Sequence, residues 1–130
     1  MPFLGSVRMN DIHHAHGYHF ASNVTQFVLE HPDWCIRDAA GQIVGGLDYA
    51  VAEVREHRHD IMREQLERYD MDGLELDFIR TAPFFRPGRE QQDGSILTDF
   101  VRQLRGMLNG VAARRGRSRL IATTMFTCAT

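Results

Sequence analysis

Two acidic side chains, Glu75 and Asp77, lie two residues apart between Asp72 and Arg80. Apolar and polar residues alternate around them, which is the pattern of a β-strand with two different faces. The apolar face would carry Leu74, Leu76 and Phe78. Two carboxylates in one polar cavity can have separated pKa values, as an acid catalyst and an ionised partner need. On a solvent-facing edge strand the same pattern carries no chemistry, and the sequence leaves both interpretations open.

A second polar group, Arg8, Asn10 and Asp11, stands at the carboxyl end of the strand predicted at the start of the chain. In a parallel barrel this end of the strands is the ligand face, and these side chains suit recognition of hydroxyl groups. Asn and Asp also serve turns well, so the alternative is that Asn10 and Asp11 shape the turn. We expect Arg80 to act as a positioning or ion-pairing residue.

Histidines are dense in the following loop, at positions 13, 14, 16 and 19. His14 and His16 form the H-x-H arrangement with which amidohydrolase barrels bind a divalent metal, and neutral imidazoles suit zinc, nickel or iron. The chain offers no second ligand cluster, so we predict no metal and no cofactor. His13 and His14 are instead expected to contact a ligand or to pack the loop.

The elements that would position these residues alternate between strand and helix along the chain. Hydrophobic periodicity, Gly and Pro positions and turn residues predict their limits. In order they are a strand over Phe3–Asn10, a helix around Val24–Glu30, hairpin arms at Trp34–Ile36 and Gln42–Val44, a helix from an N-cap at Asp48 to about Tyr69, a strand over Gly73–Phe78, a loop over Thr81–Gly94, a helix over about Thr98–Ala113 and a strand over Leu120–Phe126.

The long helix after Asp48 has apolar residues mostly three and four apart, which indicates a buried stripe on a charged rod. The stripe would consist of Val51, Val54, Ile61, Met62, Leu66 and Tyr69. A cationic run near the other end of the chain, Arg114, Arg115, Arg117 and Arg119, has no interleaved aromatic residues. We therefore interpret it as a solvated helix end and turn.

The composition is that of a soluble globular domain: 130 residues, 43% hydrophobic and 25% charged. A net charge of -2 gives no broad basic field, so a nucleic-acid partner is not expected. There is no apolar run near ~18 residues and no signal-peptide pattern, so no membrane span is predicted. Cys35 and Cys128 form no disulfide framework, which leaves the localisation open.

The order strand, helix, strand, helix, strand is the βαβαβ pattern of a parallel sheet with right-handed crossovers. Three such strands would leave both outer edges unpaired. We therefore expect residues 1–130 to form one partial α/β domain, about three strands of a TIM-type barrel. A closed barrel takes ~250 residues, so further strands are expected from the rest of a longer chain.

The chain resembles the barrel proteins grouped as glycosyl hydrolase-like family 10. The resemblance rests on Leu47–Ala50, Glu53–Arg55, Ile61–Glu64 and Leu66–Phe78, together with Ser6–Asp11 and His31–Trp34. It covers most of the 130 residues. It implies a parallel α/β barrel and action on, or binding of, a carbohydrate. Under this resemblance Trp34, Phe84 and Phe85 would stack on a sugar ring or pack beneath the loops over the site.

More distantly, Asp72-Gly73-x-Glu75-x-Asp77 is similar to the catalytic strands of two glycosidase families. In family 18 chitinases the catalytic acid would fall at Ile79, which cannot donate a proton, so chitinase chemistry is not expected. In the D-G-F-R-x-D strand of alpha-amylases the nucleophile would fall on Asp77, with Glu75 in place of the arginine. That similarity favours Asp77 over Glu75.

Most glycosidases use two carboxyl groups, ~5 Å apart for retention and ~6.5–9.5 Å apart for inversion. Residues i and i+2 of a strand are roughly 6.5 Å apart along the backbone, so Glu75 and Asp77 can share a site without being the catalytic pair. We expect the partner acid on a strand outside this segment. The alternatives are a metal-dependent hydrolase using His14 and His16, and a carbohydrate-binding barrel without catalysis.

Overall fold

In the computed structural model of the protein, residues 1–10, 26–78 and 83–125 are described. They contain five strands and three α-helices. The elements are β1 (Leu4–Arg8), α1 (Gln26–Glu30), a short 3-10 helix η3 (Pro32–Trp34), β2 (Cys35–Arg37), β3 (Ile43–Leu47), α2 (Ala52–Arg68), β4 (Gly73–Asp77), α3 (Glu90–Arg114) and β5 (Ile121–Met125). No helix of this part of the chain is long and apolar enough to cross a membrane.

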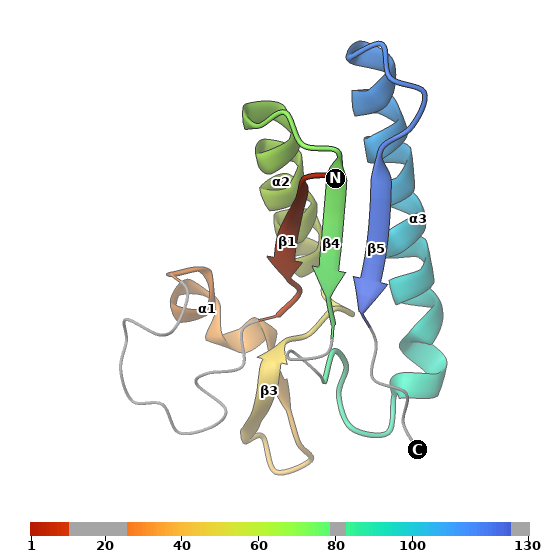
Figure 1. Cartoon of the computed structure of the whole chain (residues 1–130). Coiled ribbons are helices and arrows are strands. Elements are labelled where there is room, and N and C mark those ends of the chain that lie inside the picture. Colours follow the sequence, from red (N-terminus) through yellow and green to blue (C-terminus); the bar gives the residue numbers. More distant parts are fainter. Residues whose placement is uncertain (11–25, 79–82, 126–130) are drawn as a thin grey trace.

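The centre of the fold is a three-stranded sheet in the order β1-β4-β5. Both pairings are parallel, with Arg8 opposite Asp77 and Asp77 opposite Met125. The predicted parallel βαβαβ unit is therefore confirmed, and the acidic strand β4 is its middle strand (Figure 1).

One face of the sheet is covered by α2 and α3, which Figure 1 shows on the same side of it. Alternate residues of the strands enter this core, as the sequence pattern predicts. The core contains Val7, Leu74 and Leu76 from the strands, Val54, Met62 and Leu66 from α2, and Phe100, Leu104 and Leu108 from α3. Because Glu75 and Asp77 alternate with these leucines, their side chains project from the opposite face.

The small hairpin predicted around residues 38–41 is also present. Strands β2 and β3 pair antiparallel, with Cys35 opposite Leu47. At the tip, the carboxylate of Asp38 accepts hydrogen bonds from the backbone N–H groups of Ala40 and Gln42. Figure 1 shows this hairpin beyond the carboxyl ends of the three parallel strands. It therefore stands at the end of the sheet to which Asp77 belongs.

The prediction that Asp48 caps α2 is wrong. The helix begins at Ala52, and its N-cap position is Val51, which makes no side-chain cap. Asp48 instead forms a turn before the helix: its carboxylate accepts from the N–H of Ala50 at 2.9 Å. Asp serves such turns as readily as helix caps, and sequence alone does not separate the two uses.

The start of α3 was also predicted wrongly, because the helix begins at Glu90 rather than near Thr98. Gly94 lies inside it, at a cost of only about 1 kcal/mol relative to Ala. Acidic residues in the first turn favour the helix N-terminus. Arg89 Nε also donates to the Asp93 carboxylate at 2.9 Å. The preceding loop is therefore shorter than the breaker-rich sequence indicates.

The buried stripe of α2 is only partly as predicted. Val54, Met62 and Leu66 are fully buried, but Tyr69 is 58% exposed because the helix ends at Arg68. Arg58 and His59 are buried as well, although neither was assigned to the stripe.

The arginine run after α3 is not uniformly solvated, contrary to the prediction. Arg115 donates to the backbone carbonyls of Leu66, Tyr69 and Met71, at the end of α2 and before β4. Arg117 pairs with the carboxylates of Asp70 at 3.0 Å and Asp72 at 2.9 Å. Only Arg114 and Arg119 of this run are exposed. Arg115 and Arg117 therefore join α3 to the connection between α2 and β4.

Candidate functional site

Asp77 ends the middle strand of the sheet, on the face that the helices leave free. Its side chain is mostly enclosed, with the residue 9% exposed. Glu75, two residues earlier on the same face, is half-buried and accepts a hydrogen bond from the Ser6 hydroxyl at 3.3 Å. The structure thus places the two predicted carboxylates on one face of one strand.

Three connecting segments meet at the carboxyl end of the sheet, next to Asp77. The hydroxyl of Tyr49, after β3, donates to the backbone carbonyl of Met9, after β1. The backbone N–H of Tyr49 donates to the carbonyl of Phe84, in the segment after β4, at 2.9 Å. Arg86 of that segment pairs with the carboxylate of Asp48 at 3.4 Å. These contacts join the three segments around the end of β4. We call the residues that make them, Met9, Asp48, Tyr49, Phe84 and Arg86, the frame.

Asn10 also belongs to this frame and is 1% exposed. Its amide nitrogen donates to the backbone carbonyl of Leu47, and its amide oxygen accepts from the N–H of Leu47, both at 2.8 Å. The amide therefore holds the base of the hairpin against the end of β1. The sequence left open two other roles for Asn10, recognition of hydroxyl groups and shaping of the turn after the strand, and did not predict this link to Leu47. A contact with substrate stays a prediction.

Arg8 lies beside Asp77 in the sheet register, and its residue is exposed. Its backbone carbonyl accepts from the guanidinium of Arg58 at 3.3 Å. Arg58 is 8% exposed, and its Nε is buried without a hydrogen-bond partner. The sequence did not predict a buried guanidinium next to the carboxyl end of the sheet. The signal was present, because Val54, Arg58, Met62 and Leu66 follow one another at intervals of four on a helix face.

Tyr49 was also missed, although it is fully buried at the centre of the frame. Burial raises the pKa of its phenol far above the ordinary value, and the neighbouring Arg58 acts in the opposite direction. The phenol therefore stays protonated and serves as a hydrogen-bond donor to Met9. This assigns Tyr49 to the architecture of the site.

Trp34 is half-buried in an aromatic cluster beside the hairpin. Its ring stacks on His31 with centroids 3.9 Å apart, and Phe27 lies 5.5 Å away. Phe27 in turn stacks on His57 of α2 at 3.6 Å. Burial lowers the pKa of His57, with a smaller contribution from Arg58. The cluster attaches α1 and η3 to α2, and stacking of Trp34 on a sugar stays a prediction.

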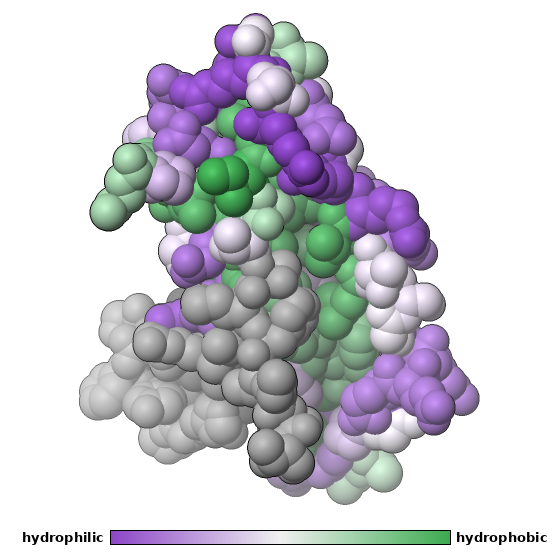
Figure 2. All heavy atoms as spheres, turned by 45° about the vertical axis from the view of Figure 1, so that its right-hand side comes forward, coloured by the Kyte–Doolittle hydropathy of each residue, from purple (hydrophilic) through white to green (hydrophobic). Residues whose placement is uncertain are grey.

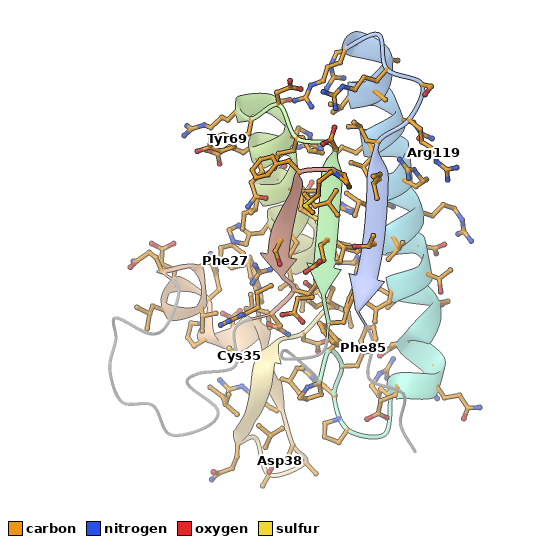
Figure 3. The ribbon with its side chains drawn as sticks, in the orientation of Figure 1. Phe27, Cys35, Asp38, Tyr69, Phe85 and Arg119 are labelled. Carbon is orange, nitrogen blue, oxygen red and sulfur yellow. The ribbon has the colours of Figure 1, made fainter. Side chains whose placement is uncertain are left out.

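The two phenylalanines after β4 pack beneath their loop. Phe85 is 4% exposed, and Phe84 makes edge contacts with the rings of Tyr49 and Phe78, both with centroids 5.3 Å apart. Figure 3 labels Phe85 beyond the carboxyl end of the sheet. This agrees with the packing interpretation of both rings.

Several predicted site residues lie outside the described residues, namely Asp11, His13, His14, His16 and Arg80. Their roles stay predictions. Within the described ranges, no three His, Cys, Asp or Glu side chains are grouped so that they could hold a metal ion. A hollow of about 530 Å³, bordered by Asp72, Arg117 and Ile121 among others, lies at the opposite, amino end of the strands. It is separate from the end that carries Asp77.

Comparison with known proteins shows a similarity to a solved structure. No protein-family model matches the chain, and no curated protein matches it. Among solved structures, the chain is similar to the crystal structure of a noncanonic maltogenic alpha-amylase, AmyB, from Thermotoga neapolitana. The match has a TM-score of 0.58 and 27% sequence identity, and it covers 95% of this chain and 24% of the amylase. The chain therefore spans about a quarter of that protein's length, and its mixed α/β fold is similar to part of a glycoside hydrolase.

Proposed function

We propose that the chain is part of a parallel α/β barrel that hydrolyses glycosidic bonds, with Asp77 as a catalytic carboxylate. One observation carries this proposal: Asp77 ends the middle strand β4 on the helix-free face, where the connections after β1, β3 and β4 meet. In α/β barrels the carboxyl ends of the strands hold the reacting groups. The family 10 assignment has no support from family models and stays part of this proposal.

The similarity to an alpha-amylase supports carbohydrate as the substrate class. It agrees with the likeness of the β4 sequence to the amylase strand in which the nucleophile corresponds to Asp77. Since the match covers 24% of the amylase, the rest of the barrel would come from further strands. The second carboxyl group that hydrolysis needs would lie on one of them.

In this proposal the residues have separate tasks. Asp77 would attack or stabilise the sugar at its anomeric carbon, and a protonated acid elsewhere would release the leaving group. Glu75, held by Ser6, would lie deeper in the cleft and contact the substrate. The proposed substrate-binding set is completed by Arg8, Asn10, Asp11, His13, His14, Trp34 and Arg80.

The test is to replace Asp77 by Asn in the full-length protein and to measure hydrolysis of malto-oligosaccharides and of a panel of nitrophenyl glycosides. Loss of the carboxylate is expected to reduce kcat by at least about 1,000-fold, the size of effect seen when a catalytic group is removed. Asp60→Asn is the matched control, because Asp60 is an exposed residue of α2 in a surface ion pair with Arg63. Activity of Asp77→Asn equal to that of the control would rule out the catalytic role.

Two other results would point to the alternatives. Oligosaccharide binding without hydrolysis over a long incubation would favour a carbohydrate-binding barrel that lacks catalysis. Activity abolished by a chelator and restored by zinc would favour a metal-dependent hydrolase using His14 and His16.

A further inference from the structure

One arginine in the described part of the chain is buried. Arg58, within α2, is 8% exposed, whereas the other described arginines are exposed or half-buried. On the face of the molecule that Figure 2 shows, hydrophilic residues border a central area of hydrophobic ones. A cationic side chain in the interior is therefore an exception here, and burial of a charge is costly unless the charge is paired.

Among the described residues, no carboxylate forms an ion pair with Arg58. It contacts neutral groups instead: Nη1 donates to the backbone carbonyl of Arg8 at 3.3 Å, and the guanidinium lies beside the phenol of Tyr49. Nε is buried without a hydrogen-bond partner. Val54 and Met62, four residues away on either side in the same helix, are apolar and fully buried. An apolar side chain would continue this row, so packing alone does not account for an arginine at this position.

The carbonyl that Arg58 holds belongs to the peptide group between Arg8 and Met9. The N–H of the same peptide group donates to the backbone carbonyl of Asp77 at 3.2 Å. Because a peptide group is planar and rigid, a donor that fixes its carbonyl oxygen also fixes the direction of its N–H. Arg58 is therefore connected to the backbone of Asp77 through one peptide group and two hydrogen bonds.

The next peptide group is held as well. The carbonyl of Met9 accepts from the hydroxyl of Tyr49, whose phenol lies beside Arg58. Hydrogen bonds that follow one another in the protein interior polarise and strengthen each other. A guanidinium that donates to the Arg8 carbonyl thus makes the Met9 N–H a stronger donor to Asp77.

We propose that Arg58 is a positioning residue, which sets the location of the Asp77 carboxylate through the peptide group between Arg8 and Met9. The carboxylate of aspartate is joined to Cα by a single methylene group, so it follows small movements of the backbone. A misplacement of about 1 Å at a reacting group can cost on the order of 100-fold in rate. This inference rests on the proposed catalytic role of Asp77, and one of its tests does not require activity.

The first test compares Arg58→Leu with Arg63→Leu in the full-length protein, on the glycoside of the panel above that is hydrolysed fastest. Arg63 is an exposed arginine of the same helix, so its substitution makes the same change of net charge. Arg58→Leu is expected to lower kcat by about 10- to 100-fold and to change KM by less than about 2-fold, because only the position of the reacting carboxylate changes. Arg63→Leu is expected to have neither effect.

Further variants separate positioning from a general loss of folded protein. Arg58→Lys keeps a positive charge and an N–H donor for the Arg8 carbonyl, so it is expected to retain more of kcat than Arg58→Leu. In the Asp77→Asn protein, Arg58→Leu is expected to cause no further loss, since residues that act as a unit are not additive. Thermal melting of each variant shows that it is folded, and Arg58→Gln takes the place of Arg58→Leu if the latter does not fold.

The second test measures the amide of Met9 by NMR in protein labelled with ¹⁵N-methionine. Exchange of this amide with solvent deuterium is expected to be at least about 5-fold faster in Arg58→Leu than in Arg63→Leu, because its hydrogen bond to Asp77 is weakened. The reference is the amide of Met71, which donates to the Tyr69 carbonyl at the opposite end of the sheet. It is expected to exchange equally in both variants.

Three results would overturn the proposal: equal kcat in Arg58→Leu and Arg63→Leu, the same loss from Arg58→Leu with and without the Asp77 carboxylate, and unchanged exchange of the Met9 amide. The third result decides against it even if the protein hydrolyses no glycoside. Faster exchange of Met9 together with an absence of hydrolysis would contradict the proposed function and support the connection from Arg58 to Asp77.

Discussion

The imidazole of His59 is buried between α2 and α3, where its ring stacks on Phe100 with centroids 4.2 Å apart. Its Nε2 lies 3.2 Å from the backbone carbonyl of Phe100. Burial lowers the pKa of His59 below the ordinary value of 6.5, and the contact with the carbonyl opposes this only in part. The fold therefore favours the neutral ring.

This burial predicts a pH dependence of stability. The unfolded state binds the proton more tightly than the folded state does. The contribution of the neutral His59 to the free energy of unfolding is therefore complete above pH 6.5, and it is lost as the pH decreases through the lower pKa of the folded state. Chemical denaturation between pH 8 and pH 5 measures this loss. His59→Gln keeps an N–H donor for Phe100 but does not titrate, so its loss of stability is expected to be smaller.

Other groups with shifted pKa values also affect the pH dependence of stability. His57 has a lowered pKa too, so the single variant retains part of the effect and a variant with both histidines replaced loses more. The carboxyl pKa values of Asp72 and Asp93 are lowered from 3.8, so their contributions disappear only at more acidic pH. An unchanged pH profile in His59→Gln would contradict the role given to His59.

At the scale of single residues, alternation along a strand was enough to predict the two faces of β4. Glu75 and Asp77 share a face because strand geometry requires it, and Leu74 and Leu76 are buried as expected. Arg58 was missed because a charged residue in an apolar row is usually expected in solvent. The structural role of Asn10 depends on Leu47, 37 positions away, which no local pattern reports.

At the scale of elements, β4 and β5 approach each other so closely that the first residue of β4 has to be a glycine. A Cβ atom at Gly73 would lie 1.9 Å from the backbone carbonyl oxygen of Ile121, and the φ angle there is +157°. No flexible side chain can move aside, since the contact is with backbone. Gly73 is therefore needed where the acidic strand begins.

Gly73→Ala is predicted to lower the free energy of unfolding by about 3 kcal/mol or more, because steric overlap and an unfavourable φ angle act together. Urea denaturation measures the effect. The matched control is Gly106→Ala in α3, where no atom outside the adjoining backbone of the helix and the two neighbouring residues lies within 4 Å of the added Cβ. There the substitution is expected to stabilise by about 0.5–1 kcal/mol, since alanine is the better helix former. Similar effects of the two substitutions would contradict this account.

The sequence predicted which elements exist better than where they begin. Alternation and turn residues indicate the parallel strands and the hairpin, which are present within a few residues of the predicted limits. The helix starts were wrong because they depend on specific partners. Asp48 is held in a turn by contacts with Ala50 and Arg86, and the Arg89–Asp93 pair supports an earlier start of α3.

At the scale of the whole molecule, β4 is the only described strand of the sheet that is hydrogen-bonded on both sides. We predict that its backbone amides exchange with solvent deuterium more slowly than those of the β2–β3 hairpin, which has one partner per strand. Hydrogen exchange with mass spectrometry compares Gly73–Asp77 with Ile43–Leu47. Slower exchange in the hairpin would show that the sheet is not the most stable unit.

The three-stranded parallel sheet was predicted from the order of the elements, and the similarity to part of an amylase agrees with it. Closure into a barrel was predicted too, but it depends on strands beyond these three and stays a proposal. The predictions for Asp11, His14 and Arg80 concern residues outside the described part of the chain and stay predictions.

The pair of hydrogen bonds between Asn10 and Leu47 separates the base of the hairpin, which holds the fold together, from its tip, which can change in sequence. Since the hairpin is fastened to the sheet at its base, the exposed tip around Ala39 and Ala40 does not support the rest of the fold. Insertions, deletions or grafted sequences at the tip would leave the frame around Asp77 undisturbed. The hairpin tip is therefore a natural place for evolution or engineering to vary the sequence while the arrangement around Asp77 stays constant.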